Sequence, residues 1–183
     1  MIITISGKPG SGKNTVAKLL SEKLGYKVYL IGGLRRKMAS DRGISLAELN
    51  KIGESDPITD TSVDNYQKEL ARKEGDIIVV GRISFHFMPQ SVKIFLDVSL
   101  NTGAERILNN DRKTEKFSNI GEAIKSVKER IQSDTRRYKK YYNLDCYDLT
   151  HYDLIIDTTS TTAEEVAVKI VTYLKIKKYI NKE

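Results

Sequence analysis

The stretch IITISGKPGSGKNT, residues 2–15, decides how the rest of the chain is read. Its first five residues form a short run that is mostly apolar and β-branched, which predicts a buried parallel strand that ends at Gly7. The residues that follow fit the glycine-rich phosphate-loop pattern G-x-x-x-x-G-K. That pattern normally continues with Ser or Thr, but here Asn14 takes this place and the hydroxyl comes one residue later, at Thr15.

A helix is predicted directly after the loop, because apolar residues recur at helical spacing up to Leu24 and Gly25 can end it. A glycine-rich turn between a strand and a helix presents backbone N–H groups and the positive end of the helix to an anion. We therefore expect the loop to bind the phosphates of ATP. The expected ATP-binding residues are Gly7, Lys8, Pro9, Gly10, Ser11, Gly12, Lys13, Asn14 and Thr15.

Further apolar runs predict strands over residues 27–31, 76–82, 92–98 and 152–158, with helices between them. This alternation predicts an α/β fold with a parallel sheet covered on both faces. We expect one domain over residues 1–183.

Four segments between and after the strands have distinct characters. Residues 32–75 are interpreted as a small helical subdomain on the rim of the sheet, with few residues for a deep core. Residues 110–119 are charged and suit a mobile flap, which places a lid at about residues 110–130. A long helix is predicted over residues 120–142, and an amphipathic helix from Thr162 onward ends the fold.

Composition excludes several classes of protein. Cys146 is the only cysteine, so an internal disulfide or a cysteine-based metal site is impossible, and a reducing cytoplasm is expected. No apolar run approaches the roughly 20 residues that span a bilayer, which predicts a soluble protein. The net charge of +7 leaves three explanations open: a nucleic-acid partner, a phosphorylated substrate, or a lysine-rich soluble surface.

The chain resembles the archaeal-type cytidylate kinases, which are P-loop nucleoside monophosphate kinases, over nearly its whole length. The matching segments, in order, are GKPGSGKNTVAKLLSEKLG, RRKMASDRGISLAEL, DP with VDNYQKELA, VVGR, KIFLDV, AERI and RIQSDTRRYKKYYNLDCYDLTHYDLIIDT. The resemblance implies a five-stranded parallel sheet flanked by helices, a helical acceptor-binding subdomain, a mobile lid, ATP and Mg²⁺ as cofactors, and a monomer. In this family, threonine also stands second after the lysine, where it would bond a phosphate of ATP.

The resemblance also assigns roles to individual residues. Lys13 would reach the β- and γ-phosphates, while Arg36 and Arg82 would hold the 5′-phosphate of the acceptor. Arginine suits this task because its planar fork meets phosphate oxygens in pairs. Arg112 would fold from the flap onto the donor.

The pattern R-x-x-x-D-x-x-R places Arg130, Asp134 and Arg137 on one helical face, so they should point to one place. By resemblance, Asp134 would contact the ribose of the acceptor, and the two arginines would act on phosphate charge. Lys13, Arg82, Arg130 and Arg137 are thus the expected catalytic residues.

The chain departs from the family pattern at the metal and at the base. Relatives commonly carry an acidic residue before the Gly-Arg pair, where this chain has Val80, and Asp97 is expected to be structural. The positions that read cytosine in bacterial relatives are here Ile31 and Ile83. Residues of the helical subdomain are alternative base readers, although solvated helix faces are the favoured interpretation for them: Asp60, Asp64 and Gln67.

The leading hypothesis is therefore ATP-dependent phosphorylation of CMP, with dCMP or UMP as further acceptors. Two alternatives stay open: a P-loop kinase for another acceptor such as AMP, and a weakly active or non-catalytic nucleotide- or RNA-binding protein. Asn14, Val80 and the sequence pI of 9.3 favour the second of these.

Overall fold

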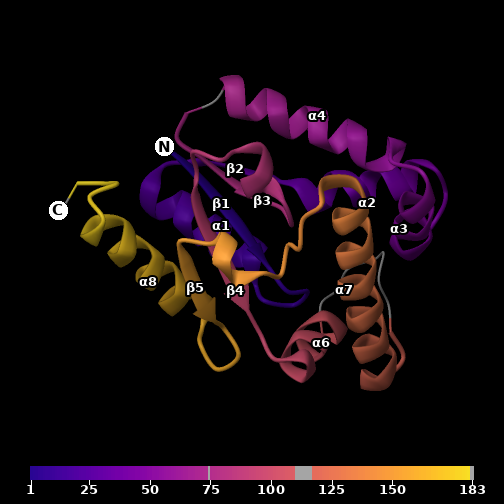
Figure 1. Ribbon diagram of the computed structural model, residues 1–183. Helices are drawn as coiled ribbons and strands as arrows, with labels where there is room; N and C mark the ends of the chain where they lie inside the picture. Colours follow the sequence, from indigo (N-terminus) through magenta and orange to yellow (C-terminus); the bar gives the residue numbers. More distant parts are fainter. Residues whose placement is uncertain (74, 110–116, 182–183) are drawn as a thin grey trace.

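The computed structural model describes residues 1–73, 75–109 and 117–181, which form a five-stranded parallel sheet surrounded by helices (Figure 1). The strands lie in the order β2-β3-β1-β4-β5, and every neighbouring pair is parallel. Their bounds are β1 Ile2–Gly7, β2 Lys27–Leu30, β3 Ile77–Val80, β4 Val92–Asp97 and β5 Leu154–Asp157. The predicted α/β class with a five-stranded parallel sheet is confirmed.

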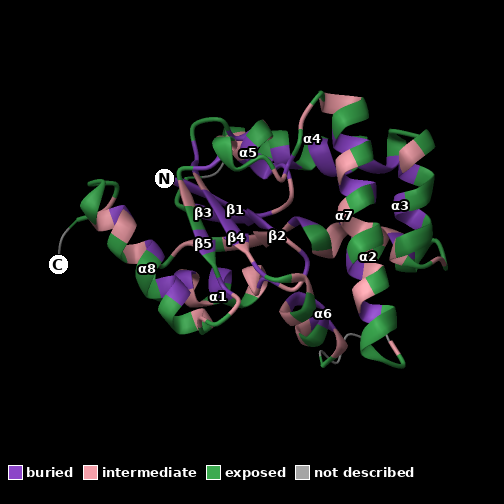
Figure 2. Cartoon of the chain, turned by 60° about the horizontal axis from the view of Figure 1, so that its bottom comes forward, coloured by how far each residue is buried: buried purple, intermediate pink, exposed green. Residues whose placement is uncertain are grey.

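One face of the sheet is covered by α1 (Lys13–Leu24) and α8 (Ala163–Ile176), as Figure 2 shows. Side chains alternate between the two faces of a strand, so Ile3 and Ile5 of β1 both point to this face. They join Leu20 of α1 and Ile170 of α8 in one buried apolar cluster. This packing positions the start of α1, and with it the phosphate loop.

The opposite face is covered by α2 (Ile31–Asp41), α4 (Ile58–Lys73) and the short α5 (Ser84–Phe87). Ile2 and Ile77 point to this side and pack with Ile31, Val63 and other buried residues. Both faces of β1 and β3 are therefore buried, which explains why these strands read as largely apolar runs rather than as alternating ones.

Two further helices stand at the carboxyl end of the strands: α3 (Leu46–Ser55) and α7 (Ile120–Tyr142). In α3, the Ser45 hydroxyl accepts a bond from the Glu48 N–H, and the Glu48 carboxylate accepts one from the Ser45 N–H, a capping box that fixes where the helix begins. α3 packs against both α2 and α7, and α6 (Leu100–Leu108) packs along α7. A 3₁₀ turn, η1 (Leu149–His151), precedes β5.

The predicted elements exist, but several boundaries were wrong. The strands expected over 76–82 and 152–158 are shorter, because their ends leave the sheet to form the loops at its edge. α2 begins at Ile31, which was expected to be the last residue of a strand, and takes both following glycines into its first turn. The turns α5 and η1 were not predicted.

The expectation of solvated helix faces was wrong for α4. Asp60, Asp64 and Gln67 are 4%, 7% and 2% exposed. Each has a partner from another element: Arg137 donates to Asp60, Tyr142 donates to Asp64, and Ser84 donates to Gln67. These polar residues are core residues of the fold, because their partners satisfy the hydrogen bonds that burial would otherwise remove.

Burial raises the pKa of Asp64 to about 6. The hydrogen bond from Tyr142 opposes this rise. The nearby carboxylate of Asp60 raises the pKa further, whereas the positive charges of Lys68 and Arg35 lower it. The folded state therefore holds this proton more tightly than the unfolded chain does. The contribution of Asp64 favours folding below about pH 4 and is lost as the pH rises through about 6.

We expect Asp64→Asn to remove this dependence, because an amide stays neutral and still accepts the bond from Tyr142. Relative to wild type, the variant should gain about 1–2 kcal/mol of unfolding free energy between pH 4 and 7.5, after allowance for solvent screening. Urea unfolding of both proteins across this range measures the difference. A difference that stays constant with pH would contradict the assignment.

Candidate nucleotide site

A cavity of about 420 Å³ opens at the carboxyl edge of the sheet. Its walls come from the ends of different strands and the segments after them: the loop after β1, the start of α2 after β2, residues 80–82 at the end of β3, and residues 158–163 after β5. α3 and α7 close its other side. In open α/β sheets, ligands bind at this edge, beside the strand from which the connections run to opposite sides of the sheet. Here that strand is β1.

The phosphate loop is held in place by close backbone contacts. Gly10 and Gly12 have φ angles of +78° and +79°, which favour glycine. A Cβ on Gly10 would lie 2.2 Å from the carbonyl oxygen of Gly103 in α6, while a Cβ on Gly12 would meet open space. Gly12 also caps α1, so the amino end of that helix faces the cavity.

Lys13 lies over the loop that precedes it. Its ammonium group donates to the carbonyl oxygens of Gly7 and Lys8 at 3.0 and 2.6 Å and to the Ser11 hydroxyl at 3.1 Å. The cation is thus held at the mouth of the loop, where an anion would meet both it and the helix end.

Asn14 and Thr15 lie in the first turn of α1 and line the cavity, so each can present a side-chain oxygen to a ligand. Asp97, at the end of β4, pairs with Lys8 at 2.7 Å and accepts the backbone N–H of Val98, as expected of a structural residue. Among the described residues, no group of three or more His, Cys, Asp or Glu side chains is placed to hold a metal ion. The neutral side-chain oxygens of Asn14 and Thr15 are the loop groups that a phosphate-bound Mg²⁺ would meet.

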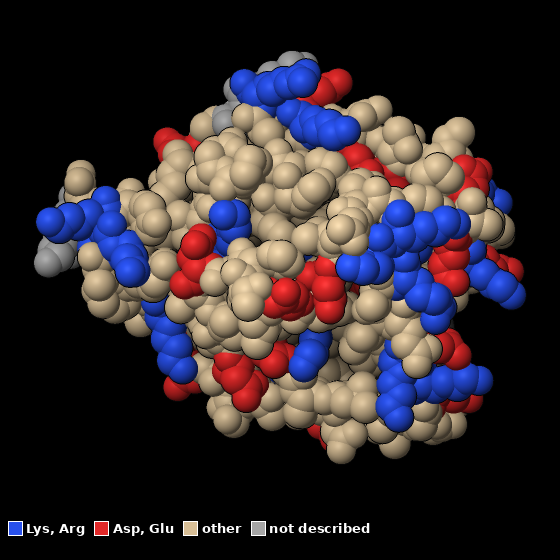
Figure 3. Space-filling view, viewed as in Figure 1, with Lys and Arg blue, Asp and Glu red and all other residues tan. Residues whose placement is uncertain are grey.

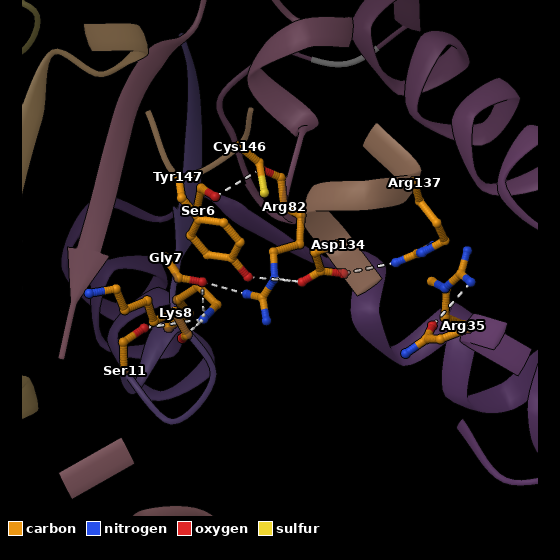
Figure 4. Close-up of polar contacts among 12 residues, drawn as sticks. Ser6, Gly7, Lys8, Ser11, Arg35, Arg82, Asp134, Arg137, Cys146 and Tyr147 are labelled. Carbon is orange, nitrogen blue, oxygen red and sulfur yellow. Dashed lines mark hydrogen bonds and ion pairs between the residues drawn. The ribbon is translucent and has the colours of Figure 1, made fainter. Parts of the chain in front are cut away.

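A buried chain of alternating charges crosses the other side of the cavity, and Figure 4 shows its part from Arg82 through Asp134 to Arg137. On α4, Asp60 accepts from Arg35 of α2 and, at 2.9 Å, from Arg137 of α7. Arg137 also donates to one oxygen of Asp134, at 2.8 Å, and Arg82 donates to the other, at 2.7 Å. We call these five residues the charge chain.

The charge chain ends at the phosphate loop. Arg82 donates through its second nitrogen to the carbonyl oxygen of Gly7, and the Ser6 hydroxyl donates to the Arg82 carbonyl at 2.8 Å. Tyr147 donates to Asp134 at 3.0 Å. One connected set of bonds therefore joins the helices α2, α4 and α7 to the loop.

Asp134 is the centre of this arrangement. Burial opposes its ionisation, but Arg82 and Arg137 outweigh burial and hold the pKa of Asp134 below its ordinary value. The charge chain contains three arginines and two aspartates, so it keeps one positive charge in excess. That excess favours a site for an anion.

Of the remaining predicted residues, two line the cavity and one lies outside the described part of the chain. Arg36 on α2 and Arg130 on α7 line the cavity, so Arg36, Arg82, Arg130, Asp134 and Arg137 all reach one site. Arg112 lies outside the described residues, as do residues 110–116 of the expected lid.

Sequence reasoning missed Arg35, Tyr147 and Arg106. Arg106 of α6 donates to the carbonyl oxygen of Thr158 at 2.7 Å and lines the cavity beside the loop after β5. Arg35 stands next to Arg36 in sequence, and only the tertiary fold shows that it is 8% exposed. Tyr147 follows the end of α7 in an irregular segment and had no local signal.

Comparison with known proteins agrees with this geometry. A model of the cytidylate kinase-like family matches residues 2–160. The chain belongs to the cytidylate kinase-like family. It is 45% identical over 158 residues to the cytidylate kinase of Methanothrix thermoacetophila, covering 86% of this chain and 88% of that protein. It is 40% identical over 167 residues to the cytidylate kinase of Methanocella arvoryzae, covering 91% and 93%.

Solved structures support the fold of this cytidylate kinase-like chain. An uncharacterised protein from Eubacterium ventriosum has a TM-score of 0.68 at 21% identity, covering 96% of this chain and 98% of that one. Shikimate kinase from Aquifex aeolicus has a TM-score of 0.60 at 22% identity, covering 97% and 98%. The predicted P-loop kinase fold and the predicted enzyme class, a nucleoside monophosphate kinase, are confirmed by these relatives and the family match.

The loop contacts make a prediction for two matched alanines. Gly10→Ala and Gly12→Ala both place a side chain at a left-handed backbone conformation, which should lower the unfolding free energy by roughly 1–2 kcal/mol in each variant. Only Gly10→Ala also drives a Cβ into the backbone of α6, so it should lower the unfolding free energy by at least about 1 kcal/mol more than Gly12→Ala does. Urea unfolding measures both, and equal losses would show that the loop does not rest on Gly103.

The charge chain makes a second prediction. Asp134→Ala leaves two buried arginines without their shared carboxylate and should cost about 3–5 kcal/mol of unfolding free energy. The control is Glu54→Ala, which removes an equally short but more exposed pair with Arg136 and should cost about 0–1 kcal/mol. Chemical unfolding checks both, and similar losses in the two variants would argue against a buried network.

Proposed function

We propose that the protein transfers the γ-phosphoryl group of ATP to CMP and releases ADP and CDP. The observation that carries the proposal is that one cavity joins a phosphate loop to a buried set of arginines in a chain of the cytidylate kinase-like family. A cavity with a phosphate loop at one side and arginines at the other suits two phosphorylated ligands that meet between them.

ATP occupies the side of the loop in this proposal. Backbone N–H groups of the loop and the amino end of α1 hold its phosphates, and Lys13 moves from the loop carbonyls to the β- and γ-phosphates. Asn14 and Thr15 add neutral oxygens beside the phosphates that carry Mg²⁺. When bound, this ion neutralises part of the phosphate charge.

CMP occupies the side of α2, α3 and α7. Its 5′-phosphate meets Arg36, whose forked group can bind phosphate oxygens in pairs. Arg82 and Arg137 already donate within the charge chain, so they act on the phosphate mainly through the positive charge that they place beside it. Asp134 already accepts from Arg82, Arg137 and Tyr147, so its first task is to hold these donors in place. A remaining lone pair accepts a ribose hydroxyl, and Arg130 faces the transferring group.

The chemistry needs no general base, because the attacking group is an anionic oxygen of the CMP phosphate. A bond forms between this oxygen and the γ-phosphorus while the bond from the γ-phosphorus to the β–γ bridging oxygen breaks in line. The chain's own contribution is to align the two phosphates and to balance their charge. Closure of the 32–75 subdomain and of a lid at about residues 110–130 keeps water from taking the phosphoryl group.

The test is product formation from ATP and Mg²⁺ with CMP, dCMP, UMP, AMP and GMP offered separately. CDP should form fastest in wild type. Lys13→Ala should lower kcat by about 10²- to 10³-fold, because it removes a cation aimed at the charge that develops in the transition state. The control is Lys18→Ala, an exposed lysine of the same helix, which should leave kcat unchanged.

Other outcomes assign other functions. Faster phosphorylation of AMP than of CMP would overturn the acceptor while keeping the reaction. ATP binding without any product would point to a non-catalytic nucleotide-binding protein. On the face drawn in Figure 3, Lys and Arg form separate groups with Asp and Glu between them, so this face offers no continuous basic track for a nucleic-acid strand.

A further inference from the structure

The residues assigned so far to the acceptor side of the cavity do not include one that recognises the base. The positions that read cytosine in bacterial relatives are apolar here, and Ile83 is buried against Tyr138 and Cys146. The arginines on this side are bonded within the charge chain or assigned to phosphate charge in the proposed function, and the two oxygens of Asp134 already accept three hydrogen bonds. The base must be read by another group.

Asn50 is a neutral polar side chain in this wall. It lies on α3, is 9% exposed and lines the cavity. Arg35 donates to its side-chain oxygen at 3.2 Å. Because a guanidinium cannot accept, the atom that meets Arg35 must be the amide oxygen, and this bond fixes which way the amide points.

The amide nitrogen of Asn50 is left to face the cavity. Within the described part of the chain, this nitrogen has no hydrogen-bond acceptor. It is not one of the unbonded polar atoms that the protein encloses completely, so solvent can reach it. It therefore presents two N–H donors at a surface that a ligand can reach.

Arg35 holds the amide rigidly, because it is itself anchored. Its other terminal nitrogen donates to the Asp60 carboxylate and to the Thr59 carbonyl, and the residue is 8% exposed. Leu46, one turn before Asn50 on α3, also lines the cavity and offers an apolar contact for the face of a flat ring. A donor fixed beside an apolar wall is suited to read the edge of a base.

We propose that Asn50 selects the base of the acceptor, with its amide N–H groups donating to the ring nitrogen N3 and the carbonyl oxygen O2 of cytosine. Uracil carries a hydrogen on N3, so a donor of the base would face a donor of the protein. A site built to bond one pattern rejects the other, because its buried polar group then stays unpaired. This inference rests on the proposed function, since it names the reader of the proposed acceptor.

The test compares CMP with UMP in three proteins: wild type, Asn50→Ala and Asn50→Asp. In Asn50→Ala, the ratio of kcat/KM for CMP to that for UMP should fall at least tenfold, mainly through a higher KM for CMP. Asn50→Asp keeps the bond from Arg35 but turns an acceptor toward the base, so it should lower the ratio further by accepting from N3–H of uracil. Asn101→Ala, at an exposed asparagine of α6, is the control and should keep the wild-type ratio.

Titration calorimetry of CMP and UMP without ATP reads the same preference independently of turnover. If wild type binds CMP more tightly than UMP and Asn50→Asp reverses this order, the inference is supported even when no acceptor is phosphorylated. If the variants weaken CMP and UMP equally, Asn50 only supports the fold and the inference is overturned. If wild type phosphorylates CMP and the variants keep its preference, the inference fails while the proposed function stands.

Discussion

The arrangement of the site depends on the carboxylate of Asp134. Two arginines from different elements, Arg82 after β3 and Arg137 on α7, meet on its two oxygens. Without it, these cations would repel one another in a buried environment, where charge interactions are stronger than in water. With it, they are held close together and still keep an excess of positive charge. The same ion pairs that hold α7 onto the sheet therefore prepare the cavity for an anion.

The phosphate loop is held from the opposite side by backbone rather than by charge. Gly7 approaches Leu96 of β4 so closely that a Cβ would lie 2.1 Å from its carbonyl oxygen, and Gly10 approaches Gly103 of α6 in the same way. Glycine is required at these two places by neighbours as well as by backbone angles. Because Arg82 also donates to the Gly7 carbonyl, the loop and the charge chain meet at one residue. A shift of α7 would thus be felt at the loop.

Features that depend on a short stretch of sequence could be predicted, whereas features that depend on contacts between distant elements could not. The phosphate loop, the strand before it and the shared face of Arg130, Asp134 and Arg137 are local patterns, and the structure brings those residues to the cavity. The sequence could not show that the polar face of α4 is buried, since Asp60 reads as a solvated residue until Arg35 and Arg137 are seen beside it. For the same reason, the neighbouring Arg35 and Arg36 look alike in sequence, although Arg35 is a buried member of the charge chain.

Asp60 joins the residues on the acceptor side of the cavity into one connected set of hydrogen bonds. It accepts from Arg35, which fixes the amide of Asn50, and from Arg137, which meets Asp134 and through it Arg82. Three elements that precede β3 in sequence, α2, α3 and α4, are thereby bonded to the arginines proposed for the phosphate. If Asn50 reads the base, then base and phosphate are sensed by one continuous set of buried bonds. A base that leaves Asn50 unpaired would then disturb the placement of Arg35, and through Asp60 that of Arg137, so discrimination would extend from binding into alignment for transfer.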